Sequence, residues 1–153
     1  MKKALFLLAA APLTLASCDQ LGLPNPNLPS VSGTVTGTAP REGATRIGMR
    51  GISAAGFVAA NPNQIAINLD QTRYTAELPQ LNADGAIEVF AFVDGNNNRA
   101  YDSGEPRTDG VTFIHVQQEN ALNRLTGLKR GWNRVEGLRA VSGTKFSNVN
   151  FVW

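Results

Sequence analysis

One short run of the chain, from Asp94 to Glu105, holds residue types whose spacing suits a metal ion; its sequence is DGNNNRAYDSGE. The run matches the calcium-loop pattern D-x-[DN]-x-[DN]-G-x5-E at every defined position except the sixth. Alternate side chains of a tightly curled loop converge on one point, and Ca²⁺ takes about six to eight oxygen ligands. The predicted ligands are the side chains of Asp94, Asn96, Asn98, Asp102 and Glu105 and the main-chain carbonyl group of Ala100.

Arg99 is the departure from this pattern, because it stands where the pattern has Gly. That position requires a left-handed backbone, which costs a residue with a Cβ atom on the order of 1 kcal/mol. The loop's three carboxylates leave only a small excess of negative charge over Ca²⁺, so the expected affinity is weak, about 10⁻⁴ to 10⁻³ M. Mg²⁺ is disfavoured because it prefers a smaller, rigid octahedron. The alternative is a polar hairpin whose Asn and Gly residues only form the turn.

Strands must position this loop. Residues 87–93 (IEVFAFV) are apolar at nearly every position, which predicts a central strand covered on both faces. Tyr101, at the eighth position of the run, is expected to pin the loop to the core. Residues 30–38 and 73–78 alternate apolar with polar side chains and predict half-buried strands. Further strand-like runs lie at residues 65–69, 111–116, 135–141 and 145–153. Residues 45–60 predict strands without exact bounds.

The composition agrees with a strand-rich fold. With 42% hydrophobic and 17% charged residues among 153, the chain is a folded protein and not a disordered polymer. Seven or more short strands separated by turn residues predict an all-β fold, an antiparallel β-sandwich. The helical candidate is Gln117 to Arg124, of one or two turns. The aromatic residues near the C-terminus, Phe151 and Trp153, are expected to fill the sandwich core.

A family resemblance accompanies the loop. Val89 to Asn98 (VFAFVDGNNN), followed by Gly104-Glu105-Pro106, resembles the calcium-type loop of bacterial envelope proteins with transthyretin-like or immunoglobulin-like sandwiches, including the B-type repeats of surface adhesins. The resemblance covers about Tyr74 to Pro106 and is specific for a loop and not for a function. It implies the same side-chain ligands as the spacing does. Some such adhesin domains form a Lys-Asn crosslink, but Lys129 and Lys145 have no evident acidic partner here.

The N-terminus has the features of a targeting signal. Lys2 and Lys3 precede an apolar run from Ala4 to Leu15, too short for a bilayer span. Leu15-Ala16-Ser17-Cys18 resembles the lipobox of bacterial lipoproteins, which implies cleavage before Cys18 and lipidation of its thiol group. The expected organisation is a signal peptide at 1–17, a lipidated Cys with a Pro/Asn-rich tether at 18–30, and a β-sandwich domain at 31–153. The alternative is an ordinary signal peptide that leaves Cys18 free, and a single Cys excludes an internal disulfide.

Charge argues against nucleic acid as a partner. Removing 17 residues from 153 leaves 136, and the loss of Lys2 and Lys3 leaves 12 basic residues against 12 acidic ones. A mature chain of zero net charge lacks the basic excess that phosphate binding requires. The expected location follows from the lipobox resemblance: the bacterial cell envelope, with the chain lipid-anchored on the periplasmic side or the cell surface.

The sequence offers no convergent catalytic set. His115 is the one His of the chain and lies in a predicted strand, and no G-x-S-x-G elbow occurs. Carboxylates such as Glu77 and Glu88 leave an acid/base hydrolase open as an alternative, and carriage of a small ligand is another. We expect a non-enzymatic structural or interaction module that contacts an envelope protein, a surface layer or a glycan.

The best candidate for partner contact is the segment LKRGWNR, where Arg130 and Arg134 flank Trp132. An exposed Trp beside Arg is typical of binding hot spots. The equally supported alternative is a Trp that closes one end of the core.

Overall fold

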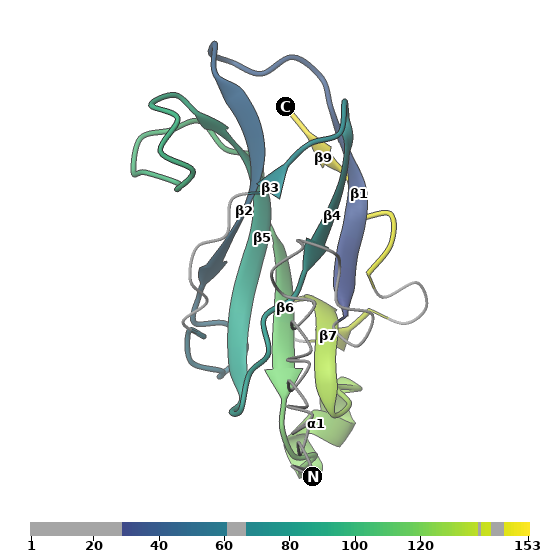
Figure 1. The fold of residues 1–153 in the computed structure, drawn as a ribbon. Coiled ribbons are helices and arrows are strands. Elements are labelled where there is room, and N and C mark those ends of the chain that lie inside the picture. Colours follow the sequence, from purple (N-terminus) through teal and green to yellow (C-terminus); the bar gives the residue numbers. More distant parts are fainter. Residues whose placement is uncertain (1–28, 61–66, 138, 142–145) are drawn as a thin grey trace, which may run out of the picture.

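The computed structural model describes residues 29–60, 67–137, 139–141 and 146–153, and in it two β-sheets enclose a common hydrophobic core (Figure 1). One sheet has three strands in the order β4-β1-β9, and the other has six in the order β3-β2-β5-β6-β7-β8. This architecture confirms the predicted all-β sandwich. The predicted signal peptide, Cys18 and all of the predicted tether except its last two residues lie outside the described residues.

The elements are short and connected by turns. Their bounds are β1 Ser30–Thr36, β2 Ala44–Gly51, β3 Ile67–Asn68, β4 Arg73–Glu77, β5 Gly85–Asp94, β6 Val111–Val116, α1 Ala121–Thr126, β7 Gly131–Glu136, β8 Arg139–Ala140 and β9 Phe151–Val152. Neighbouring strands pair antiparallel except β1 and β9, which are parallel.

Strand β5 is the centre of the larger sheet, as its apolar sequence predicts. It pairs with β2 on one side and β6 on the other, and only Glu88 among its ten residues is not fully buried. Ile87, Val89 and Ala91 point into the core between the sheets. Because side chains alternate along a strand, Phe90 and Phe92 point to the opposite face, where the candidate loop lies.

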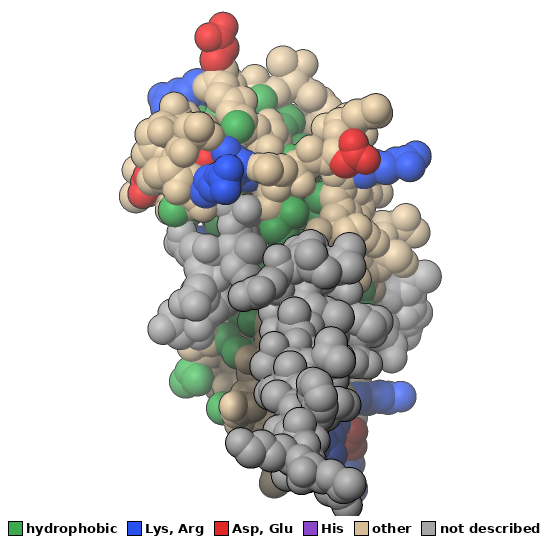
Figure 2. Space-filling model, in the orientation of Figure 1, with side chains coloured by type: hydrophobic (Ala, Val, Ile, Leu, Met, Phe, Trp, Pro, Cys, Tyr) green, Lys and Arg blue, Asp and Glu red, His purple; other side chains and the backbone are tan. Residues whose placement is uncertain are grey.

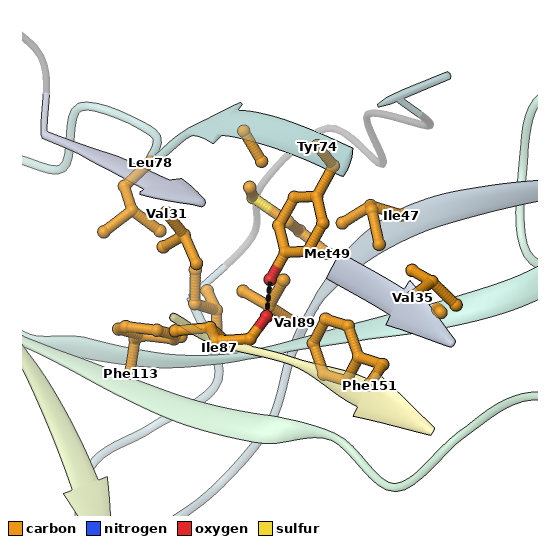
Figure 3. Packing of buried hydrophobic residues seen from close by; sticks show 13 residues of the cluster. Val31, Val35, Ile47, Met49, Tyr74, Leu78, Ile87, Val89, Phe113 and Phe151 are labelled. Carbon is orange, nitrogen blue, oxygen red and sulfur yellow. Dashed lines mark hydrogen bonds between the residues drawn. The ribbon is translucent and has the colours of Figure 1, made fainter. Parts of the chain in front are cut away.

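The inner core joins both sheets (Figure 3). Strands β1 and β4 contribute their alternate apolar residues, as the period of two predicts. Phe151 is buried and its ring stacks on Tyr74, with ring centroids 5.8 Å apart. Trp153 is half-buried and packs against the same cluster, so the C-terminal aromatic residues belong to the sandwich core.

Three local predictions differ from the structure. The strand predicted at 145–153 is a strand only at Phe151–Val152 among its described residues. The helix occupies Ala121–Thr126 and not Gln117 to Arg124, because the Asn120 side chain caps it by accepting the Asn123 N–H group. The run predicted as one strand at 135–141 contains the turn between β7 and β8. Gly137 permits this turn, since its backbone has a φ of 62°.

Tyr74 links the two edges of the smaller sheet. Its hydroxyl group donates to the carbonyl oxygen of Val149 at 2.6 Å, the dashed contact of Figure 3. Burial raises the pKa of the Tyr74 hydroxyl group well above its ordinary value, and the charge of Arg134 opposes only part of that rise.

A dependence of stability on alkaline pH follows from Tyr74. The folded state binds the phenol proton more tightly than the unfolded state, so this contribution is fully present below about pH 10 and is lost as the pH rises further. Tyr74→Phe is expected to lower the free energy of unfolding by about 1 kcal/mol at pH 7, because it loses the hydrogen bond to Val149. Its free energy of unfolding should also decline less than that of the wild type above pH 10. Urea unfolding at pH 8 and pH 10.5 measures both effects. An equal alkaline decline in the wild type and the variant would contradict this role.

Candidate functional site

The loop between β5 and β6 folds back over the outer face of the six-stranded sheet. Its returning arm pairs with β5 through Val93 N–H to Pro106 O and Thr108 N–H to Ala91 O, both at 2.9 Å. The Tyr101 ring packs edge-on against Phe90 and Phe92, with centroids 5.1 Å and 5.7 Å away. Tyr101 therefore pins the loop to the sheet, as predicted.

Four of the predicted ligand side chains gather within this loop. One carboxylate oxygen of Asp102 accepts hydrogen bonds from the amide groups of both Asn96 and Asn98, each at 2.8 Å. Glu105 accepts the main-chain N–H of Gly95 at 2.9 Å and that of Asp102 at 3.0 Å. The side chains at the third, fifth and ninth positions are thus hydrogen-bonded together, and the twelfth joins them through the main chain of the loop.

Asn98 and Ala100 also shape the turn. The Asn96 side-chain oxygen accepts the Asn98 N–H at 3.1 Å, and the Asn98 side-chain oxygen accepts the Ala100 N–H at 2.8 Å. Arg99 has a φ of 62°, so the sixth position is left-handed, as the pattern predicts for a Gly. The strain expected from Arg99 is therefore present in the backbone.

Asp94, the first predicted ligand, is buried beneath the loop, and its carboxylate shares the Asn98 N–H donor with the side-chain oxygen of Asn96. Its side chain is fully buried, and its carboxylate accepts the Arg46 Nε–H at 2.5 Å. The main-chain N–H groups of Asn98 and Arg99 donate to the same carboxylate at 3.1 Å and 3.0 Å. Burial alone would raise the pKa of the Asp94 carboxyl group, but the Arg46 and main-chain hydrogen bonds lower that pKa below its ordinary value.

Arg46 is the residue of this site that sequence reasoning missed. It lies on β2 opposite Phe92 of β5, and its guanidinium group also donates to the side chains of Asn68 and Asn97. The sequence signal for Arg46 was a basic residue directly before the apolar Ile47, within the segment 45–60 that was predicted as strands without exact bounds. Residues 46–49 are all buried.

The predicted partner-contact residues do not form one surface. Trp132 lies on the inner face of β7, half-buried, and its indole N–H donates to Pro79 O at 3.1 Å. Arg134 is on the same face, and its Nε atom is buried without a hydrogen-bond partner among the described residues. Arg130 is exposed, and its main-chain N–H donates to Glu119 at 3.1 Å. Trp132 is therefore half-buried against the core, and Arg130 is the exposed residue of the three.

The candidate acid/base residues do not converge either. Glu88 points to the outer face of the larger sheet, where Arg50 and Arg107 each donate to it at 2.8 Å. Glu77 belongs to β4 of the smaller sheet and alternates with inward-facing neighbours. His115 lies beside Trp132, with its Nδ1 atom 2.9 Å from Ala83 O. These groups lie on different faces of the sandwich.

Metal binding at the loop would depend on amide and carbonyl oxygens as well as carboxylates. Within the described part of the chain, no three His, Cys, Asp or Glu side chains are grouped so that they could hold a metal ion. Figure 2 shows both acidic and basic side chains at the end of the sandwich that carries the loop.

None of the helices in the described ranges is long and apolar enough to cross a membrane. The chain matches no known family model, and no curated protein or solved structure is similar enough to count as a match.

Proposed function

We propose that the chain is a lipid-anchored module of the bacterial cell envelope, in which the β-sandwich serves a structural or binding role and not a catalytic one. The lipobox-like segment ending at Cys18 and the Pro-rich stretch after it support anchoring. The partner class is another envelope protein, a surface layer or a glycan. The transthyretin-like or immunoglobulin-like family of envelope domains is part of this proposal, on the residues of the loop.

The proposal includes weak calcium binding by the loop. The observation that carries it is the gathering of Asn96, Asn98, Asp102 and Glu105 on one exposed loop that Tyr101 attaches to the sheet. Their oxygens, with the Ala100 carbonyl group, are the hard ligands that Ca²⁺ prefers. Asp94 fits less well, because its carboxylate is buried against Arg46. Bound calcium would hold the two arms of the loop together and so stabilise the sandwich.

Calorimetric titration of calcium into the full chain in detergent tests this proposal. We expect saturable binding with a dissociation constant of about 10⁻⁴ to 10⁻³ M and a higher melting temperature in calcium than in chelator. Asp102→Ala is expected to abolish both effects, since Asp102 lies at the centre of the network.

Arg99→Gly is the matched variant in the opposite direction. It removes a side chain from a left-handed position and a positive charge from the loop, so it should gain up to about 1 kcal/mol of stability and bind calcium more tightly. Absence of binding at 10 mM calcium by both the wild type and Arg99→Gly would overturn the calcium part of the proposal and leave the polar hairpin.

A further inference from the structure

The Arg46 side chain joins β2, on which it lies, to loop 94–105 and to β3. Its guanidinium group donates to Asp94 at the end of β5, to Asn97 within the loop at 2.6 Å, and to Asn68 on β3. Only 7% of the Arg46 side chain is exposed. A planar guanidinium group has its donors fixed in a fork, so three acceptors in these places hold the loop in one position relative to the sheet.

The positive charge of Arg46 lies where a metal ion bound by Asp94 would have to lie. Asp94 is the first ligand of the calcium-type pattern, and its buried carboxylate already has a cation 2.5 Å away. A divalent ion that used the same carboxylate would lie beside a second buried positive charge, and like charges at short range repel strongly away from water. Ca²⁺ and Arg46 cannot both occupy the inner side of Asp94.

We propose that Arg46 is the resident cation of loop 94–105: its guanidinium group takes the place of a metal ion at Asp94, so the loop folds without metal, and Ca²⁺ competes with it. The competition between Arg46 and Ca²⁺ rests on the proposed calcium binding. The folding of the loop without a metal ion does not. Arg46 thereby acts as a positioning residue that sets the metal affinity of the site.

Thermal melts in chelator, followed by calcium titration of the full chain in detergent, test both parts. Arg46→Gln keeps hydrogen-bonding capacity but removes the charge, and it leaves the buried Asp94 carboxylate without its counter-ion. We expect its melting temperature in chelator to fall by roughly 10 °C, since breaking a buried pair is strongly destabilising. We expect its calcium affinity to exceed that of the wild type by roughly tenfold or more, since the competing cation is gone.

Two further variants sharpen this experiment. Arg50→Gln is the matched control, because Arg50 lies on the same strand and face but pairs with Glu88 outside the loop. It should leave calcium affinity unchanged. Asn97→Gly removes one loop acceptor of Arg46 without straining the left-handed backbone there, where φ is 57°. It should raise calcium affinity several-fold even if Arg46→Gln fails to fold.

The outcomes separate this inference from the proposed function. An unchanged melting temperature of Arg46→Gln in chelator overturns the inference. Equal calcium affinities in the wild type, Arg46→Gln and Asn97→Gly overturn the competition. A lowered melting temperature with no calcium binding by any variant supports Arg46 as the resident cation and refutes the calcium part of the proposed function.

Discussion

Gly33→Ala is expected to destabilise the sandwich strongly, because the added Cβ atom would overlap backbone atoms. A Cβ atom at Gly33 would lie 2.0 Å from the carbonyl oxygen of Val149 and 2.6 Å from its carbonyl carbon. Both obstructing atoms belong to the backbone, so no side-chain rotation relieves the overlap. The same carbonyl group accepts the Tyr74 hydroxyl hydrogen bond, and the Val149 N–H donates to Ser32 O at 3.0 Å.

The alanine methyl group would therefore push the segment around Val149 away from β1. Two contacts depend on the position of that segment and would be weakened: the Tyr74 hydrogen bond and the parallel pairing of β1 with β9. We expect a loss of about 3 kcal/mol or more, at the upper end of the cost of overpacking a core. Differential scanning calorimetry should then show a melting temperature lower by roughly 10 °C.

Gly95→Ala is the matched control for Gly33→Ala. A Cβ atom at Gly95 would meet only a Glu105 side-chain oxygen, at 3.9 Å, which is ordinary contact distance. Its melting temperature should stay within about 2 °C of the wild type. Comparable losses in the two variants would show that the close approach of Val149 to β1 does not limit the fold.

Cys18→Ala is expected to release the chain from the membrane. If the segment ending at Cys18 is processed as the lipobox resemblance implies, several acyl chains attach at this residue. Each buried CH₂ group contributes about 0.8 kcal/mol to membrane binding, and an anchor with more than one acyl chain is lasting. We expect the wild type in the membrane pellet after a high-salt wash and the variant in the soluble fraction, a change of more than roughly tenfold in partition.

Ser17→Ala provides the control for Cys18→Ala, because it keeps a small residue before the cysteine and should leave partition unchanged. The competing hypothesis is an ordinary signal peptide with a free thiol, and it predicts that the mature wild-type chain carries no lipid at Cys18. In that case, a thiol reagent labels Cys18 of the mature wild-type chain, and its intact mass shows no lipid. Either result would refute the anchor.

Local sequence patterns were enough to predict much of the sandwich. The apolar run at 87–93 became β5, and the alternating runs became β1 and β4, because a strand turns successive side chains to opposite faces whatever its neighbours are. Strand β2 lies almost entirely in the segment 45–60, which was predicted as strands without exact bounds, and there is a physical reason for that. A Cβ atom at its Gly48 would lie 3.0 Å from the Phe90 ring, so the strand carries glycine where aromatic rings cover it.

The polar loop was predicted from its residues, but its geometry was predicted only in part. Spacing placed Asn96, Asn98, Asp102 and Glu105 on one loop, and they lie in one hydrogen-bonded network. Spacing could not show that Asp94 turns inward. That orientation depends on Arg46, which is 48 residues away in the chain and reaches Asp94 only because β2 pairs with β5.

The sequence by itself therefore determined what depends on neighbours along the chain: the strands, the polar loop 94–105 and the ring of Tyr101 that attaches it. Tertiary structure alone decided what depends on strand pairing. Residues 75 positions apart meet in the Tyr74 hydrogen bond to Val149, and pairing with His115 places Trp132 on the inner face of the larger sheet. The register of the sheets brings these segments together. Neither segment's own sequence indicates which other segment it will contact.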